Sequence, residues 1–276
     1  MKKVNFSVLM SVYHKEKPDN LKLAIESIIN QTLVPNEFII VEDGPLGDEL
    51  NNCLEFYSKK YKFIKLVKLK KNVGLGNALN EGLKYCSCEY VARMDSDDIS
   101  LLDRFEKQIE FIKEHPDCEL LGGNIIEFDS NTCEDISYRI VPTKTEEIKQ
   151  YLKKRNPFNH VTVIFKKESV LNVGSYLDCP YFEVYYLWAR MIKSNKKFYN
   201  IDECLVRVRA GLEMSGRRGN IKYIKCIINF ENKLLGLKLI SILDCIKNII
   251  IRSIVSLMPN SLRYKLYQRR LRNEKN

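Results

Sequence analysis

Three carboxylates, Asp95, Asp97 and Asp98, lie within four residues of one another, directly after an apolar segment at residues 90–94. Such a segment is typical of a buried strand in a parallel sheet, and open α/β sheets bind ligands at the carboxyl ends of their strands. Acids this close repel one another unless a cation lies among them, and their oxygens suit Mg²⁺ or Mn²⁺ shared with ligand phosphates. The cluster therefore predicts a metal that holds a diphosphate, although a solvated turn capping the next helix would use the same residue types.

Two earlier turns could contact a nucleotide. Asp43 follows a second strand-like segment, where a carboxylate either accepts hydrogen bonds from a uracil or ribose edge or forms a turn before glycine. Asn72 and Gly74 open a helical stretch, where backbone can approach a phosphate and a helix N-terminus favours anions. This stretch lacks the third glycine of a dinucleotide fingerprint and the Gly-Lys-Ser/Thr ending of a P-loop, which disfavours hydride transfer and P-loop hydrolysis.

Polar residues later in the chain could complete such a site. His160 precedes a short strand-like segment and would contact an acceptor or a phosphate, or be structural. Glu183 begins a helical stretch, where the helix dipole stabilises a carboxylate and where a general base could lie. Four arginines lie near Gly211 and Gly216, namely Arg207, Arg209, Arg217 and Arg218. They would either close over a diphosphate or form a solvated basic loop.

The elements that must position these residues follow from hydrophobic periodicity. Strands are expected at 6–12, 37–41, 63–69 and 90–94, with helices between them at 21–29, 50–57 and 75–85. This alternation predicts an α/β fold with a mostly parallel, doubly wound sheet. Beyond it we expect helices at 101–114 and 183–194, strands at 119–128, 136–141, 161–165 and 205–208, and helical structure from 220 onward.

The cysteines, the N-terminal segment and the distribution of charge restrict the classes of protein to which the chain could belong. The nine cysteines are scattered without a Cys-x-x-Cys pair, so a zinc site or a disulfide framework is not expected and a reducing cytosol fits best. The apolar run near the N-terminus is too short for a signal peptide. The net charge is +10 overall, but residues 217–276 hold 14 Lys and Arg against 3 Asp and Glu. Residues 1–216 thus have a net charge close to zero, and the basic tail that follows them should bind an anionic partner.

The tail also has an uneven distribution of apolar residues. Residues 234–258 are rich in Leu and Ile but contain too many charges for a spanning helix. A polar stripe runs along one side of the expected helix, and most of the rest is apolar. This pattern favours a helix in the membrane interface, with the following basic residues on anionic head groups, over a helix packed on the body. Nucleic acid is not expected, because no known nucleic-acid-binding pattern is present.

In combination these motifs closely resemble the inverting family 2 glycosyltransferases of the GT-A fold. The resemblance covers roughly residues 5–220 and is carried by Ser-Val-Leu-Met-Ser-Val-Tyr at 7–13, Val-Glu-Asp-Gly at 41–44, Asn-x-Gly-Leu-Gly-x-Ala-Leu-Asn at 72–80 and Asp-x-Asp-Asp at 95–98. Residues 156–160, 183–188 and 208–219 are similar to the bacterial subgroup that builds amylovoran-type exopolysaccharide, capsule and O-antigen. The resemblance implies a Rossmann-like GT-A catalytic domain at 1–219, and the charge and helical pattern of the tail predict a basic helical extension at 220–276 that associates with the membrane.

The resemblance also implies roles for particular residues. The donor nucleotide would be bound by Ser11, Tyr13, Asp43, Asn72, Gly74 and Asp95. Asp95 and Asp97 would hold Mn²⁺ or Mg²⁺, and the diphosphate or the acceptor would be contacted by His160, Arg209, Arg217 and Arg218. The family usually has Glu-Asp at the start of the late helix, with the Asp as base, but here Val184 takes that place and Glu183 is the candidate.

The implied reaction is transfer of glucose or galactose from a UDP-sugar to an undecaprenyl-diphosphate-linked GlcNAc or GalNAc, at the cytoplasmic face of the cell membrane. A β-1,3 linkage is the first expectation. The alternative is a nucleotide-sugar-binding or scaffold protein whose catalysis is impaired by Val184. A nucleotidyltransferase of similar fold is disfavoured, because the loop at 13–18 contains no glycine.

Overall fold

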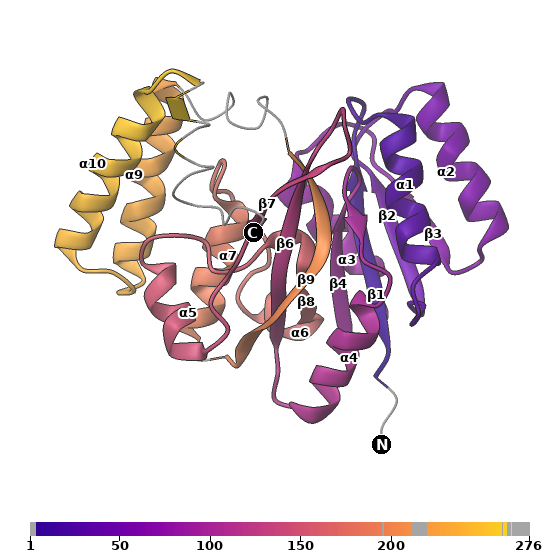
Figure 1. The fold of residues 1–276 in the computed structure, drawn as a ribbon, viewed down its shortest axis with the longest axis horizontal. Coiled ribbons are helices and arrows are strands. Elements are labelled where there is room, and N and C mark those ends of the chain that lie inside the picture. The colour runs from indigo at the N-terminus through magenta and orange to yellow at the C-terminus, as the bar shows by residue number, and fades with distance from the viewer. Residues whose placement is uncertain (1–3, 195, 211–219, 261, 264–265, 267–276) are drawn as a thin grey trace.

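A single curled sheet forms the centre of the computed structural model, which describes residues 4–194, 196–210, 220–260, 262–263 and 266 (Figure 1). Within these residues the sheet has nine strands in the order β3-β2-β1-β4-β8-β6-β9-β5, and β7 pairs with β6 outside this path. The mixed, mostly parallel sheet confirms the α/β fold expected from the sequence.

The first half of the sheet is parallel. Its elements are β1 (Phe6–Val12), α1 (Pro18–Ile29), β2 (Glu37–Glu42), α2 (Asp48–Lys60), β3 (Ile64–Lys68), α3 (Leu75–Tyr85) and β4 (Tyr90–Asp95). Strand β1 pairs in parallel with β2 and β4, and β2 pairs in parallel with β3. All four strands therefore end at the same edge of the sheet, as the alternation of strands and helices predicts.

The second half is mixed. It comprises β5 (Ile99–Ser100), α4 (Arg104–Glu114), β6 (Leu120–Asp129), β7 (Asp135–Arg139), α5 (Thr145–Leu152), the 3₁₀ turn η1 (His160–Thr162), β8 (Ile164–Lys166), α6 (Lys167–Asn172), α7 (Glu183–Lys193) and β9 (Phe198–Ala210). Strands β6 and β7 form an antiparallel pair, and β8 lies antiparallel between β4 and β6. The long β9 runs parallel to β6.

Several sequence-based boundaries need correction. The strand expected at 161–165 begins as a 3₁₀ turn, in which the Thr162 amide donates to the Asn159 carbonyl, and only β8 is extended. Helix α4 begins three residues later than expected, because the Leu101 amide still donates to the Leu205 carbonyl of β9 over 3.0 Å, next to the paired residues 99–100. The expected strand at 205–208 is the end of β9, whose exposed acids Asp202 and Glu203 interrupt the apolar pattern at an irregularity in the register. Helices α5 and α6 were not expected.

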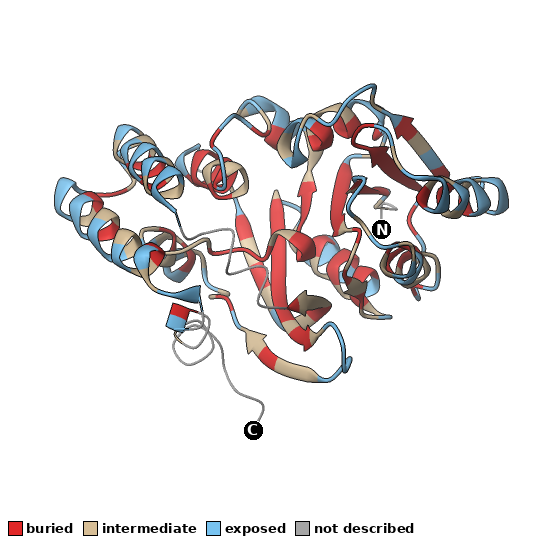
Figure 2. Cartoon of the chain, turned by 90° about the horizontal axis from the view of Figure 1, so that it is seen from above, coloured by how far each residue is buried: buried red, intermediate tan, exposed pale blue. Residues whose placement is uncertain are grey.

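Two hydrophobic clusters cover the two faces of the sheet. One contains Ile25, Leu54 and Phe105 from α1, α2 and α4. The other contains Leu79 from α3 and Trp188 from α7, and it continues into α9 (Ile221–Gly236), which packs on α7. Helix α10 (Ile242–Leu257) packs on α9 at one side of the molecule (Figure 1). Figure 2 shows the buried strands between helices with exposed outer faces. None of the described helices is long and apolar enough to cross a membrane.

Candidate functional site

The carboxyl ends of three neighbouring strands bring the expected donor-binding residues together. In the sheet register Ser11 of β1 is the partner of both Val41 of β2 and Asp95 of β4. Asp43 follows β2 directly, and its amide donates to the Val12 carbonyl over 2.8 Å. Ser11, Asp43 and Asp95 therefore lie at one edge of the sheet, where the loops of open α/β sheets bind ligands.

A buried arginine lies next to the first acid of the cluster. Arg93, in the middle of β4, is 1% exposed and forms an ion pair with Asp95, whose side chain is 35% exposed. None of its guanidinium nitrogens makes a hydrogen bond within the described residues. Sequence reasoning missed Arg93, although an arginine inside an otherwise apolar strand was the available signal.

Asp97 lies close to two other carboxylates. Burial, followed by the charges of Asp95 and Glu16, raises the pKa of Asp97 to about 7. Glu16 comes from the loop after β1 and accepts a hydrogen bond of 2.7 Å from the Ser96 hydroxyl. Sequence reasoning missed Glu16, because nothing in the chain marks a contact between segments 80 residues apart.

Asp95 and Asp97 fit a divalent cation, because a cation would relieve the repulsion that raises the pKa of Asp97. Their oxygens are the hard ligands that Mg²⁺ and Mn²⁺ prefer. No group of three His, Cys, Asp or Glu side chains that could hold a metal occurs in the part of the chain that the structure describes. A metal at these two residues would be completed by other ligands, such as water or the oxygens of a diphosphate.

Asp98 joins the acid cluster to β9. Its carboxylate is buried and accepts a hydrogen bond of 2.8 Å from the Arg209 amide. Burial, and then the charge of Asp97, raises the pKa of Asp98 well above its usual range. The Arg209 side chain in turn donates from Nε to the Asp97 carbonyl over 3.0 Å. Asp98 thus has a structural role, and Arg209 lies beside the acids, while its binding of a diphosphate stays a prediction.

Of the three other expected arginines, one is ion-paired away from the acid cluster and two lie outside the described residues. Arg207 is turned toward the β6–β7 hairpin, where it forms an ion pair of 2.7 Å with Asp135 and donates to the Cys133 carbonyl over 2.8 Å. Arg217 and Arg218 lie outside the residues that the structure describes.

Asp43 organises the loop that precedes α3. Its buried carboxylate accepts hydrogen bonds from the Val73 amide at 2.7 Å, the Gly74 amide at 3.1 Å and the Asn72 side chain at 3.0 Å. Gly74 itself has a positive φ of 84°, which favours glycine. Asp43, Asn72 and Gly74 therefore form one unit that holds the N-terminus of α3 at the edge of the sheet.

Glu183, the first residue of α7, faces the first turn of α3. A Cβ atom built on Gly76 would lie 3.6 Å from Cγ of Glu183 and 3.3 Å from Cβ of Tyr176. Burial, together with the nearby charge of Asp178, raises the pKa of the Glu183 carboxyl. The next residue, Val184, has no group that could take a proton and packs at the margin of the core. Glu183 is therefore the acid that α7 contributes at this position.

His160 is brought close to the site but is held by another side chain. Its Nε2 lies 2.9 Å from the Tyr176 hydroxyl, in a hydrogen bond whose direction depends on the tautomer. Burial, and then the positive charge of Arg93, lowers the pKa of His160 well below its usual range, so the ring is neutral. Tyr176 was not expected from the sequence; it is fixed by two hydrogen bonds between its backbone and the Asn80 side chain.

The first loop contributes an exposed aromatic ring. Tyr13 follows β1, is 38% exposed, and contacts His14 edge to face at a centroid distance of 5.7 Å. The Tyr13 ring is available to stack on a nucleotide base. Ser11 is less exposed and lies near the end of β1 at the same edge of the sheet.

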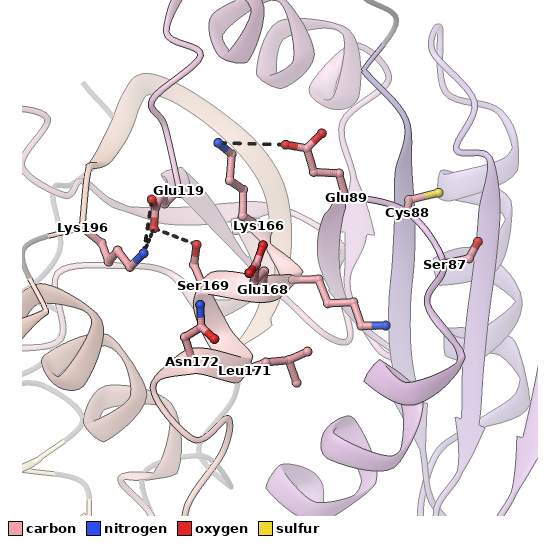
Figure 3. Close-up of a pocket in the computed structure, with 11 residues that line it drawn as sticks. Ser87, Cys88, Glu89, Glu119, Lys166, Glu168, Ser169, Leu171, Asn172 and Lys196 are labelled. Atoms are coloured by element: carbon pink, nitrogen blue, oxygen red, sulfur yellow. Dashed lines mark hydrogen bonds and ion pairs between the residues drawn. The ribbon is translucent and has the colours of Figure 1, made fainter.

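A cleft of about 620 Å³ lies at the opposite end of β4 (Figure 3). Its lysines are already engaged: Lys196 pairs with Glu119 at 3.1 Å, Lys166 with Glu89 at 4.0 Å, and Lys167 donates to the Cys86 carbonyl at 2.6 Å. The cleft is therefore less suited to an anionic ligand than the edge that carries Asp95 and Arg209.

Comparisons with known proteins identify the family of the chain. The sequence profile described as Glycosyl transferase family 2 matches residues 7–175. The chain is 39% identical to the amylovoran biosynthesis glycosyltransferase AmsE of Erwinia amylovora, over 96% of this chain and 98% of that protein. It is 38% identical to a UDP-Gal:alpha-D-GlcNAc-diphosphoundecaprenol beta-1,3-galactosyltransferase of Escherichia coli, over 97% of this chain and 96% of that protein.

A solved structure is similar in fold. The Pyrobaculum calidifontis mannosyltransferase PcManGT, in complex with GDP-Man and Mn²⁺, superposes with a TM-score of 0.66 at 11% identity, covering 96% of this chain and 75% of that one. At this identity the similarity shows the fold alone.

Proposed function

The chain belongs to glycosyl transferase family 2 and is a glycosyltransferase, and we propose that it transfers glucose or galactose from a UDP-sugar with inversion at the anomeric carbon. The observation that carries this proposal is the arrangement at one edge of the sheet. The acids after β4, the loop held by Asp43, and Arg209 lie at this edge, where open α/β sheets bind ligands, and this supports a nucleotide diphosphate as the ligand.

In the proposed donor site, Tyr13, Ser11 and the loop of Asp43, Asn72 and Gly74 bind the nucleoside. Asp95 and Asp97 would hold Mn²⁺ or Mg²⁺ beside the diphosphate. The bound ion would neutralise charge that develops on the departing UDP. Arg209 adds a positive charge on the same side, and a guanidinium is suited to phosphate oxygens.

In the proposed reaction, the Glu183 carboxylate takes the proton from an acceptor hydroxyl, whose oxygen attacks the anomeric carbon from the face opposite UDP. The C–O bond to UDP breaks as the new glycosidic bond forms, so an α-linked donor gives a β-linked product. The raised pKa of Glu183 supports this role, because a general base works best with a pKa near the operating pH. His160 is neutral and bonded to Tyr176, so it would contribute to the acceptor side by shape or by a single hydrogen bond.

The acceptor we propose is an undecaprenyl-diphosphate-linked GlcNAc or GalNAc of a surface polysaccharide, joined through a β-1,3 linkage. The name of the relative from Escherichia coli supports a lipid-diphosphate-linked GlcNAc and the linkage, and the name of the relative from Erwinia amylovora supports a role in polysaccharide synthesis. Because such an acceptor is held in a bilayer, the reaction would take place at the cytoplasmic face of the cell membrane. Residues 220–276 form the basic extension beyond a catalytic domain at 1–219 and bring positive charge to that surface.

A second candidate function rests on Val184. If Glu183 cannot act as base, the protein would bind nucleotide sugars, or act as a scaffold, without turnover. The variant Val184→Asp distinguishes the two functions: a large gain in rate from almost nothing supports the binding protein, and a small change supports Glu183 as base.

Titration calorimetry with UDP tests the donor site. We expect Mn²⁺ or Mg²⁺ to strengthen UDP binding to the wild-type protein and Asp97→Ala to remove that dependence. GDP serves as the comparison ligand and should bind more weakly. Equal binding of UDP with metal by the wild type and Asp97→Ala would overturn the assignment of Asp97.

A further inference from the structure

Helix α10 exposes apolar side chains along its outer side. These residues, the α10 ridge, are between 50% and 79% exposed and comprise Ile242, Leu243, Ile246, Ile250, Ile251, Ile254 and Leu257. Their steps of one, three or four residues place them on one continuous face, about half of the helix circumference. Contiguous exposed apolar surface of this kind marks an interaction site in a soluble protein.

The inner side of α10 carries buried polar side chains beside Cys245 and Ile249, so the most exposed face is the more apolar one, which reverses the usual arrangement of a surface helix. Asn248 is buried and donates to the Lys153 carbonyl at 2.8 Å and to the Glu231 carboxylate at 3.0 Å. Arg252 forms an ion pair of 3.0 Å with the same buried carboxylate. The polar stripe seen in the sequence therefore packs against the protein, and the apolar face is the one left to an external partner.

The charges around the ridge select the kind of partner. Lys238 and Lys247 are exposed next to it, and the single acid of α10, Asp244, is bonded to Ser241 in the helix cap. The segment that begins at residue 217 carries 14 Lys and Arg against 3 Asp and Glu. Apolar side chains flanked by cations match the boundary between acyl chains and anionic head groups.

We propose that the α10 ridge inserts into an anionic lipid bilayer, with α10 lying in the plane of the membrane. The helix has 16 residues, roughly 24 Å at 1.5 Å per residue, and is shorter than the hydrocarbon core of a bilayer. The ridge would serve transfer to a lipid-linked acceptor, so its biological purpose rests on the proposed function, whereas membrane binding itself needs no turnover.

Contacts on the inner side connect the ridge to the candidate base. The Arg252 guanidinium lies 5.8 Å from the ring of Phe182, the residue before Glu183, and 5.7 Å from the ring of Tyr185. Phe182 also stacks on Phe230 of α9 at 4.5 Å. The membrane-binding face and the start of α7 are thus held by the same packed side chains. Deleting the tail would disturb both, so the test uses substitutions on the outer face alone.

The test is binding of the full chain to vesicles, measured by co-sedimentation with phosphatidylglycerol-containing and pure phosphatidylcholine vesicles. The double variant Ile250→Glu/Ile254→Glu should bind the anionic vesicles at least roughly tenfold more weakly than the wild type, because two inserting side chains become charged. The matched control is Phe56→Glu on α2, which changes an equally exposed apolar side chain (58%) and should bind like the wild type.

Turnover on a short-chain, water-soluble acceptor should be the same for all three proteins, since the substituted side chains point away from the site. Loss of turnover in all three would count against the proposed function and leave the vesicle result standing. The inference is overturned if the wild type binds neither vesicle, if the double variant binds as well as the wild type, or if the wild type is a dimer that the double variant dissociates.

Discussion

Arg93 allows a prediction that separates function from stability. It is 1% exposed, its guanidinium makes no hydrogen bond within the described residues, and its counter-charge is the Asp95 carboxylate. A cation in this environment is expensive to bury, so a purely structural role would be better filled by an apolar side chain. We therefore expect Arg93 to be present because it fixes Asp95 for ligand binding.

The magnitudes follow from the burial of the two partners. Replacing both partners of a buried ion pair by apolar residues is neutral or stabilising by about 1–4 kcal/mol, whereas Arg93→Met removes only the buried partner. The remaining Asp95 is 35% exposed and can be hydrated, so the stability of Arg93→Met should stay close to that of the wild type. In a protein of this size, about 1 kcal/mol changes Tm by roughly 2–4 °C. Asp95→Asn should instead destabilise by about 1–3 kcal/mol, because it leaves the guanidinium without its counter-charge and solvent reduces the full cost.

The assay combines thermal unfolding without ligand and titration with UDP and Mn²⁺. We expect Arg93→Met to unfold close to the wild-type temperature, and to bind UDP with Mn²⁺ about tenfold or more weakly. The double variant Arg93→Met/Asp95→Asn should recover the stability that Asp95→Asn loses. A clear fall in the Tm of Arg93→Met, or unchanged UDP affinity, would refute the reasoning.

Three further predictions concern the base, the metal site and the loop before α3. Glu183→Gln should leave UDP binding near normal and reduce the transfer rate about 10²-fold or more, as loss of a general base does, and an unchanged rate would exclude Glu183. Because the pKa of Asp97 is about 7 and its protonated form is a poor ligand, Mn²⁺-dependent UDP affinity should fall about tenfold per pH unit below pH 7; affinity independent of pH would contradict this. Gly44→Ala should destabilise by about 2 kcal/mol in thermal unfolding, because φ is 87° and the added Cβ would lie 2.5 Å from the Asn72 amide nitrogen. The control Gly47→Ala meets no atom within 4 Å and should be close to neutral, so equal effects of the two substitutions would contradict the assignment.

The parallel half of the fold could be predicted because each strand is followed by an amphipathic helix of the right length. The second half could be predicted less well. Strand β8 has three residues and follows a 3₁₀ turn, so it is too short for a periodic signal. In β9, Asp202 and Glu203 interrupt the alternation of apolar residues, and only pairing with β6 shows that the strand continues through them.

The site shows a similar division. Asp95 and Asp97 were predictable because acids after a buried strand must lie at the ligand-binding edge. The partnership of Glu16 with Ser96 and that of Tyr176 with His160 depend on tertiary packing alone. For α10, a helical wheel shows a polar and an apolar face but does not show which of them packs against the protein. In the structure the polar face packs inward, because Asn248 and Arg252 bind the buried Glu231 carboxylate.

Transfer to a synthetic GlcNAc-diphosphate-lipid is the most direct test of the central claim. UDP-glucose and UDP-galactose are supplied separately, first with Mn²⁺ and then with EDTA, and the anomeric configuration of the product is read by NMR. The site described here predicts a β-linked product from one of the donors, formed with Mn²⁺ and lost with EDTA. No product from either donor while UDP still binds, or an α-linked product, would contradict it.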